Sequence, residues 1–243
     1  MKIAYISDLH IESYIKYIMN LQAVKENIIK DAEVGIPLII AGDLSNDKSF
    51  ALKLLGYLSQ YYRPIYFVSG NHEYYFQKQT NNSLEYLITE AEKQLGENFI
   101  YLDRQGIKEI GNKKIAGTNM WYNFYQPETE FAYLFKLNDS RFLTIDRAKE
   151  EAMKDIKYYN EVIDEVDIFV SHVPLIETPA VKKYKNDNCF RRTVDLRENK
   201  IYIAGHTHII YKTQYENSNF YFNAFGYPNE IAESEKGIKI IEL

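Results

Sequence analysis

Short apolar runs separated by longer amphipathic stretches fill the first third of the chain. The runs have the length of buried strands, and the stretches between them repeat apolar residues at helical spacing. Strands that alternate with helices predict a βαβαβ unit with parallel strands, and hence a fold of the α/β (α+β) class. The predicted strands are 3–6, 37–41 and 65–68, and the predicted helices are 15–32 and 50–58.

The rest of the chain changes from regular alternation to a mixture of helices and hairpins. Gly111-Asn112 lies between two short apolar segments and predicts a hairpin turn, so we expect an antiparallel or mixed sheet here. Thr144 is a suitable N-cap for a long helix. The pattern predicts helices at 84–95 and 145–166, hairpin strands at 107–110 and 113–116, strands at 168–170, 201–204 and 238–241, and a second hairpin around 217–219.

Length and composition exclude several classes of protein. The chain of 243 residues shows neither an internal repeat nor a low-complexity linker, so we expect one domain, 1–243. Its apolar runs are too short to cross a bilayer, which predicts no membrane partner. The short stretch from Lys2 to Asp8 leaves no room for a signal peptide, so we expect a cytoplasmic protein.

Charge and cysteine content narrow the choice further. The formal net charge of -5 argues against a surface evolved as a whole to bind nucleic acid. Cys189 is the only cysteine, so an internal disulfide is excluded, and we interpret this residue as packed in the core rather than as a nucleophile.

Polar residues that could bind a metal follow the apolar runs, at the point where each predicted strand ends. In open α/β sheets the carboxyl ends of parallel strands border one crevice, so these residues should converge there. One histidine at a strand end is more often structural than a ligand, but the ordered set favours ligands. The segments are Asp8-Leu9-His10, Gly42-Asp43, Gly70-Asn71-His72-Glu73, Ser171-His172 and Gly205-His206-Thr207-His208, and they contain all five histidines.

The sequence at these positions resembles the calcineurin-like metallophosphoesterase superfamily. The pattern of that superfamily is Asp-x-His, Gly-Asp, Gly-Asn-His-(Asp or Glu), an isolated His and Gly-His-x-His, and the resemblance spans Asp8 to His208. It implies a four-layer α/β/β/α sandwich, in which helices flank two packed mixed sheets and a dimetal site lies at the carboxyl ends of strands. Residues 117–121, 137–141 and 226–228 also echo accessory segments of a bacterial, small single-domain subgroup.

The same resemblance implies roles for individual residues. His72 would be free for catalysis, and Glu73, where many relatives have Asp, would orient its ring. Asp43 would bridge two metal ions, because a carboxylate has two oxygens. One ion would be held by Asp8, His10 and His208, and the other by Asn71, His172 and His206.

These roles lead to a hypothesis for the reaction. Two ions about 3.5 to 4 Å apart can each bind a phosphate oxygen and lower the pKa of a bridging water. The resulting hydroxide would attack phosphorus in line, and His72 would protonate the leaving alkoxide. Histidine nitrogen and carboxylate oxygen ligands favour Mn, Fe or Zn over Ca or Mg.

Two regions are candidates for binding the substrate. Residues 118–143 are aromatic and irregular, and a loop of this length is often functional. Within it, Trp121 could stack on a base or sugar, while Asp139 and Arg141 could supply polar contacts. Packing of these aromatic residues in the core is the alternative.

The second region is a basic island in this acidic protein. Its position between two ligand-bearing segments suggests that it attracts phosphates of a nucleotide or polynucleotide, and a solvated loop is the alternative. The island spans 181–200 and carries Lys182, Lys183, Lys185, Arg191, Arg192, Arg197 and Lys200.

We therefore expect a metal-dependent phosphoesterase that acts on a phosphomonoester or a phosphodiester, with nucleotides among the candidates. A nuclease of the same superfamily is an alternative, which the short chain and its acidic charge disfavour. A scaffold that binds metal without catalysis and a metallohydrolase acting on other esters or amides are the remaining alternatives. The sequence leads to no prediction of the oligomeric state.

Overall fold

The parallel strands of the βαβαβ unit predicted for the N-terminal part are confirmed, together with its second helix. The computed structural model describes residues 1–243 apart from 15–20, 31–32, 76–82 and 180–188. Its strands β1 (Lys2–Ile6), β2 (Leu38–Ala41) and β3 (Ile65–Val68) are parallel, and α2 (Lys48–Leu58) connects the last two. The helix α2 begins earlier than predicted because the Asp47 side chain caps it, accepting hydrogen bonds from the backbone of Ser49 and Phe50.

The predicted helix at 15–32 lies partly outside the described residues. Its described part forms α1 (Leu21–Val24), which continues into the π-helical turn η2 (Lys25–Ile29). A 3₁₀ turn, η1 (Ile11–Tyr14), follows β1, and a second one, η3 (His72–Tyr74), follows β3. Both of these turns continue directly from segments that carry predicted metal ligands.

Two mixed sheets make up the centre of the molecule. The first has the strand order β11-β1-β2-β3-β4, in which only the β11 pairing is antiparallel. The second has the order β5-β6-β7-β8-β10-β9, in which β6, β7, β8 and β10 are parallel and the outer strands are antiparallel. The remaining strands are β4 (Phe99–Tyr101), β5 (Lys108–Ile110), β6 (Lys113–Thr118), β7 (Ile168–Ser171), β8 (Ile201–Ala204), β9 (Ile210–Tyr215), β10 (Ser218–Asn223) and β11 (Lys239–Glu242).

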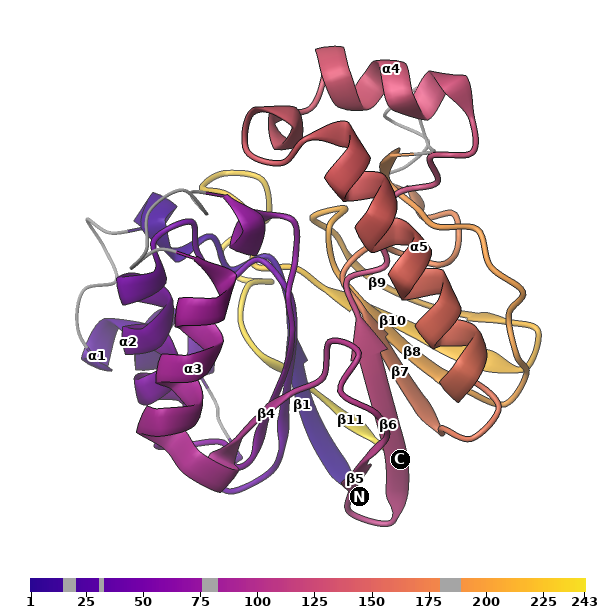
Figure 1. Ribbon diagram of the computed structural model, residues 1–243. Coiled ribbons are helices and arrows are strands. Elements are labelled where there is room, and N and C mark those ends of the chain that lie inside the picture. The colour runs from indigo at the N-terminus through magenta and orange to yellow at the C-terminus, as the bar shows by residue number, and fades with distance from the viewer. Residues whose placement is uncertain (15–20, 31–32, 76–82, 180–188) are drawn as a thin grey trace.

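Alternation of side chains along the strands produces four layers. In β2, Ile39 and Ala41 pack between the two sheets, whereas Leu38 and Ile40 pack beneath the helices on the outer face. The first sheet is covered by α1, α2 and α3 (Leu84–Leu95), and the second by α5 (Ile145–Val162) (Figure 1). The α/β/β/α sandwich is therefore confirmed.

The aromatic region 118–143 is more regular than predicted. It contains α4 (Pro127–Phe135), which begins with Pro127 in its first turn, and the 3₁₀ turn η6 (Asn138–Arg141). Several of the large apolar side chains of α4 are exposed, so their spacing does not mark a buried face. This is why the helix is not evident from the apolar pattern.

The remaining predictions of local structure agree with the fold to within a few residues. Thr144 caps α5 by accepting a hydrogen bond from the backbone of Arg147, as expected. The helix ends at Val162 rather than at 166, because a turn leads the chain into β7. A short 3₁₀ turn, η5 (Gly96–Asn98), joins α3 to β4. Among the described residues, no helix is long and apolar enough to span a membrane.

Candidate metal centre

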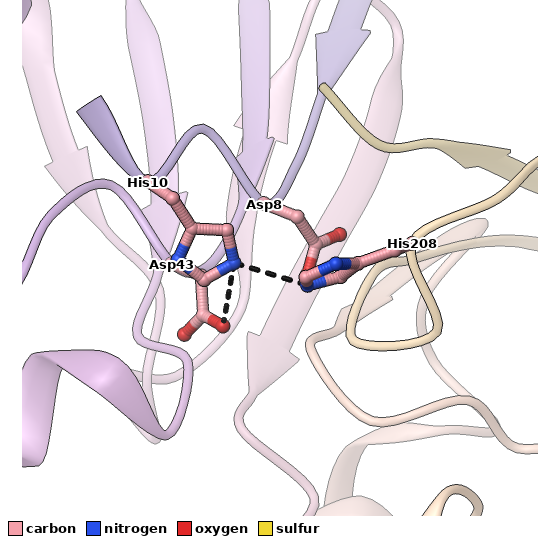
Figure 2. A group of neighbouring side chains, drawn as sticks. All are labelled: Asp8, His10, Asp43 and His208. Carbon is pink, nitrogen blue, oxygen red and sulfur yellow. Dashed lines mark hydrogen bonds and ion pairs between the residues drawn. The ribbon is translucent and has the colours of Figure 1, made fainter. Parts of the chain in front are cut away.

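Side chains from three loops meet at the carboxyl edge of the two sheets. Asp8 and His10 follow β1, Asp43 follows β2, and His208 follows β8, and Figure 2 shows the four side chains pointing toward one another. The Nε2 atom of His10 lies 3.0 Å from Nε2 of His208 and 3.7 Å from Oδ2 of Asp43. One potential ligand atom from each of the four residues lies within 4.8 Å of the others.

A second group of side chains lies on the other side of Asp43. Asn71 Oδ1 is 3.0 Å from His172 Nε2 and 3.2 Å from His206 Nδ1. The same His172 nitrogen is 3.3 Å from Asp43 Oδ2. Asp43 therefore lies between the two groups. Together, these residues are called the metal centre below: Asp8, His10, Asp43, Asn71, His172, His206 and His208.

The backbone at the metal centre adopts a conformation that is unfavourable for most residues. A positive φ in a residue other than glycine costs free energy, and such strain often occurs at functional sites. Hydrogen bonds hold it in place here, for example from the backbone N–H of His206 to Asp8 Oδ1 at 2.8 Å. The residues with positive φ are Asp8 (51°), His10 (42°), Asp43 (58°), His206 (67°) and His208 (47°).

Glycines allow the loops of the metal centre to approach one another closely. A Cβ atom at Gly70 would overlap the Asp43 carboxylate, and one at Gly42 would overlap the His172 ring. Gly42 also has a φ of 84°, which favours glycine. The glycines in the Gly-Asp and Gly-Asn-His-Glu motifs therefore make room for the ligand side chains.

Burial and neighbouring charges shift the pKa values of the carboxylates and imidazoles in the metal centre. Burial raises the pKa of Asp8. Burial also opposes ionisation of Asp43, but His172 and His72 outweigh it and hold the pKa of this carboxyl well below its usual range. Burial opposes the charge on His172, yet Asp43 raises the pKa of this imidazole to about 10. In His206, by contrast, burial lowers the pKa to about 3.

The residues present fit a divalent metal ion. They combine carboxylate oxygens, imidazole nitrogens and an amide oxygen at a buried position, which suits transition metals and zinc. Metal ligands must be deprotonated, so an ion would displace the proton that Asp43 favours on His172. His10 Nε2 faces the other ligands, at 3.0 Å from His208 Nε2 and 3.7 Å from Asp43 Oδ2, whereas the buried Nδ1 has no hydrogen-bond partner among the described residues.

His72 lies beside the metal centre, but Glu73 does not orient it. His72 Nε2 is 4.0 Å from Asp43 Oδ2, and its Nδ1 is 2.7 Å from Asn46 Oδ1. The Glu73 carboxylate instead accepts backbone hydrogen bonds from Gly70, Asp43 and Leu44 at 2.6, 2.8 and 2.8 Å. The predicted contact was wrong because the turn η3 directs these adjacent side chains to different loops.

Most of the predicted substrate contacts lie in the interior. Trp121 is 1% exposed and packs against Tyr74, and Arg192 is 2% exposed, with Nη1 donating to the Tyr122 carbonyl at 2.7 Å. Asp139 is 3% exposed and accepts a hydrogen bond of 2.8 Å from Asn71 Nδ2. In this conformation these three side chains cannot reach a substrate, since neighbouring residues cover them. Asp139 instead fixes the amide so that Asn71 Oδ1 faces His172 and His206.

The other predicted contacts remain at or near the surface. Arg141 is exposed on η6, and Arg191 is half-buried. For both residues, substrate contact stays a prediction. Lys182, Lys183 and Lys185 of the basic island lie outside the described residues. Of the rest of the island, Arg197 pairs with Asp164 and Asp195, and Lys200 donates to the Val166 carbonyl.

Three residues near the metal centre received no role from the sequence, although Tyr227 lies in the segment 226–228 noted above. Asn46 meets His72, Glu230 Oε2 lies 2.6 Å from His208 Nδ1, and the Tyr227 ring stacks on His10 with centroids 4.2 Å apart. Tyr227 and Glu230 follow β10, which is parallel to β8 and ends at the same edge. The run Phe220–Phe222, followed by Gly226, is the signal that could have placed Tyr227 and Glu230 at this edge.

Comparisons with known proteins agree with this architecture. A family model described as calcineurin-like phosphoesterase matches residues 1–209. An uncharacterized protein of Acanthamoeba polyphaga mimivirus is 26% identical over 258 residues, which cover 93% of this chain and 91% of that protein. Phosphopantetheinyl hydrolase from Mycobacterium tuberculosis has a similar structure, with a TM-score of 0.71 and 18% identity over 94% of this chain and 90% of the hydrolase chain. At that identity, the likeness to the hydrolase shows the fold alone.

Proposed function

Because the chain belongs to the calcineurin-like phosphoesterase family, we propose that it hydrolyses a phosphomonoester or a phosphodiester at a centre of two metal ions. The observation that carries the proposal is the position of Asp43 between two groups of ligands. Its Oδ2 is 3.7 Å from His10 Nε2 and 3.3 Å from His172 Nε2. One carboxylate can thus serve both groups.

The ligands divide into two sets around Asp43. Asp8, His10 and His208 would hold one ion, and Asn71, His172 and His206 the other, with Mn, Fe or Zn as the candidates. When bound, the ions would supply positive charge for the phosphoryl oxygens and a water nucleophile active at neutral pH. Asp139 holds the Asn71 amide so that its oxygen faces the second set.

His72 is the proposed general acid. Asn46 Oδ1 accepts the hydrogen on Nδ1 of this ring, which leaves Nε2–H of the protonated imidazole to donate to the leaving oxygen. The His72 side chain is 14% exposed, so a substrate can reach it. The Tyr75 ring packs beside the His72 ring, with centroids 4.3 Å apart. Glu73 acts on the loops instead, joining Gly70 to the Gly42–Leu44 turn.

Hydrolysis of two nitrophenyl esters tests this function. Purified protein reconstituted with Mn²⁺ would be assayed with bis-p-nitrophenyl phosphate and with p-nitrophenyl phosphate, beside a chelated sample. The preferred ester then separates diesterase from monoesterase activity. We expect turnover that depends on Mn²⁺.

The variant His72→Ala tests the role of the general acid. General acids contribute about 10²- to 10⁴-fold in rate, so turnover should fall by about that factor while the metal content stays unchanged. Loss of both ions from this variant would contradict the assigned role. Metal-loaded protein that hydrolyses neither these esters nor natural nucleotides would instead favour a scaffold.

A further inference from the structure

The segment that follows β10 returns to the metal centre and is attached to it by its backbone. Phe225 N–H donates to the Ser7 carbonyl at 2.9 Å, and Gly226 N–H donates to the Asp8 carbonyl at 2.9 Å. From the other side, Tyr14 Oη donates to the Gly226 carbonyl at 2.7 Å. This segment lies beyond residue 209, where the match to the family model ends.

Glu230 is the residue of this segment that meets a metal ligand. Its Oε2 lies 2.6 Å from His208 Nδ1 and also accepts the Tyr227 backbone N–H at 2.9 Å. A Cβ atom at Gly226, which has a φ of 69°, would come within 3.3 Å of the same oxygen. The backbone of the turn therefore holds the carboxylate against the His208 ring.

A carboxylate at this position determines how His208 can bind. The carboxylate accepts a hydrogen from Nδ1, so the lone pair of Nε2 is directed at the other ligands. That Nε2 atom is 3.0 Å from His10 Nε2 and 3.5 Å from Asp8 Oδ1. Tyr227 packs on the His10 ring, with an interplanar angle of 20°. Both imidazoles of this ligand set are thus held by the segment after β10.

The imidazoles of the other ligand set are held differently. His172 Nδ1 lies 2.8 Å from the Ala41 carbonyl, and His206 Nε2 lies 3.0 Å from the Cys189 carbonyl. A backbone carbonyl orients a ring without a full charge, whereas a carboxylate also makes the imidazole a stronger base. The two ligand sets therefore differ. A side chain, which substitution can remove, orients His208, whereas backbone carbonyls orient His172 and His206.

We propose that Glu230 is a positioning residue that sets the metal affinity of the Asp8, His10 and His208 site and leaves the Asn71, His172 and His206 site unaffected. The proposal rests on the proposed function, because it assumes that these ligands bind metal. It adds a residue outside the family motifs to the metal centre. A substitution at Glu230 would then change the metal affinity of one site and leave that of the other unchanged.

Calorimetric titration with Mn²⁺ tests the proposal without any substrate. In Glu230→Gln, one of the two dissociation constants should rise by roughly 10- to 100-fold, the effect typical of removing a residue that orients a ligand. In Glu230→Ala it should rise further, since the hydrogen bond is lost with the charge. The control Glu235→Gln removes the same charge from an exposed position of the same region and should bind like the wild type.

A second measurement identifies the site that is affected. In a His206→Ala background only the Asp8, His10 and His208 set is complete. Adding Glu230→Gln should weaken Mn²⁺ binding to that set in this background too. Nitrogen NMR should show hydrogen on Nδ1 of His208 in the wild type and a mixture of tautomers in Glu230→Ala. Thermal unfolding of the metal-free variants checks that they are folded.

The outcome that overturns the proposal is Glu230→Ala protein that is folded and binds both ions as the wild type does. Equal weakening of both sites would also overturn it, because the effect would not be confined to His208. Wild-type protein that binds Mn²⁺ but hydrolyses no ester would sink the proposed hydrolysis alone. The affinities of the variants would still decide the role of Glu230 in that case.

Discussion

The metal centre and the cluster formed by Arg104, Glu151 and Asp155 both bury ionisable side chains, but they balance charge in different ways. In the Arg104 cluster, Nη2 lies 2.6 Å from Glu151 Oε2, and Nη1 lies 2.9 Å from Asp155 Oδ1. In the metal centre, Asp8 and Asp43 face imidazole rings. A guanidinium keeps its proton under all ordinary conditions, whereas an imidazole can exchange its proton for a metal ion.

The positions of the two clusters match this difference. The Arg104 cluster connects the loop after β4 to α5, and Asp155 also accepts hydrogen bonds from Thr118 Oγ1 at 2.5 Å and Trp121 N–H at 2.9 Å. It therefore ties the first sheet to the helix that covers the second. The comparison suggests that fixed pairs stabilise the fold and exchangeable pairs carry its chemistry.

The substitution Asp43→Asn should have the largest effect on the metal centre. It weakens the carboxylate shared by both ligand sets, so both ions should bind less well, and kcat/KM should fall by more than about 10³-fold, or about 4 kcal/mol of transition-state stabilisation. Metal content by atomic absorption and ester hydrolysis measure the two effects. Asp164→Asn, at a carboxylate whose side chain is 70% exposed, is the control. Unchanged metal content in Asp43→Asn would contradict the proposal that Asp43 serves both ligand sets.

The substitution Arg104→Met should have the largest effect on stability. It leaves Asp155 buried without its guanidinium, so the free energy of unfolding of metal-free protein should fall by about 3 kcal/mol, the lower end for breaking a buried pair. The lower end applies because the Arg104 side chain is 25% exposed. Urea denaturation measures the change.

The control for this experiment is Arg147→Met. The Arg147 side chain is 51% exposed and pairs with Glu150 and Glu151 of the same helix, so its loss should cost less than about 1 kcal/mol. Specific activity of the folded fraction should be normal in both variants. A large loss of metal in Arg104→Met would show that the two clusters are not separate.

Removal of metal should lower the free energy of unfolding through the metal centre and not through the Arg104 cluster. With free Mn²⁺ at 100 times its dissociation constant, binding to a site stabilises the folded state by about 2.7 kcal/mol, and EDTA should abolish this gain. Scanning calorimetry at fixed concentrations should show the same decrease of Tm in the wild type and in Arg104→Met. Asp43→Asn should show little response. An identical EDTA response in all three proteins would place the bound ion elsewhere.

The smallest effect is expected for Asn46→Ala, which removes a neutral partner of His72. Turnover should fall about 10-fold, or about 1.4 kcal/mol, because the ring loses the acceptor that orients it. Metal content and the urea midpoint should stay at wild-type values. If turnover is unaffected by Asn46→Ala, the ring is oriented by other contacts, such as the packing with Tyr75.

The sequence predicts the parts of this molecule that depend on pattern and topology. Buried strands such as Leu38–Ala41 stand out because their apolar runs are continuous, and parallel pairing then brings Asp8 and Asp43 to one edge of the first sheet. The helix α4 was missed for the opposite reason. Phe131 and Phe135 are 54% and 72% exposed, so its apolar residues do not mark the core.

Contacts between side chains were harder to predict than positions. Glu73 is next to His72 in sequence, yet it bonds to the Gly42–Leu44 turn, because adjacent residues of a 3₁₀ turn point in different directions. Glu230 was missed because it reaches His208 from a segment whose path depends on β10 joining the second sheet. Such contacts require the tertiary fold, which local pattern does not encode.

The hydrogen bond between the His206 backbone and Asp8 has a consequence for folding. It joins residues 198 positions apart, one from each sheet. Closing so long a loop is entropically costly, so we expect this contact to form late in folding, once both sheets have docked. An ion bound at the finished centre would therefore slow unfolding and leave the rate of folding nearly unchanged.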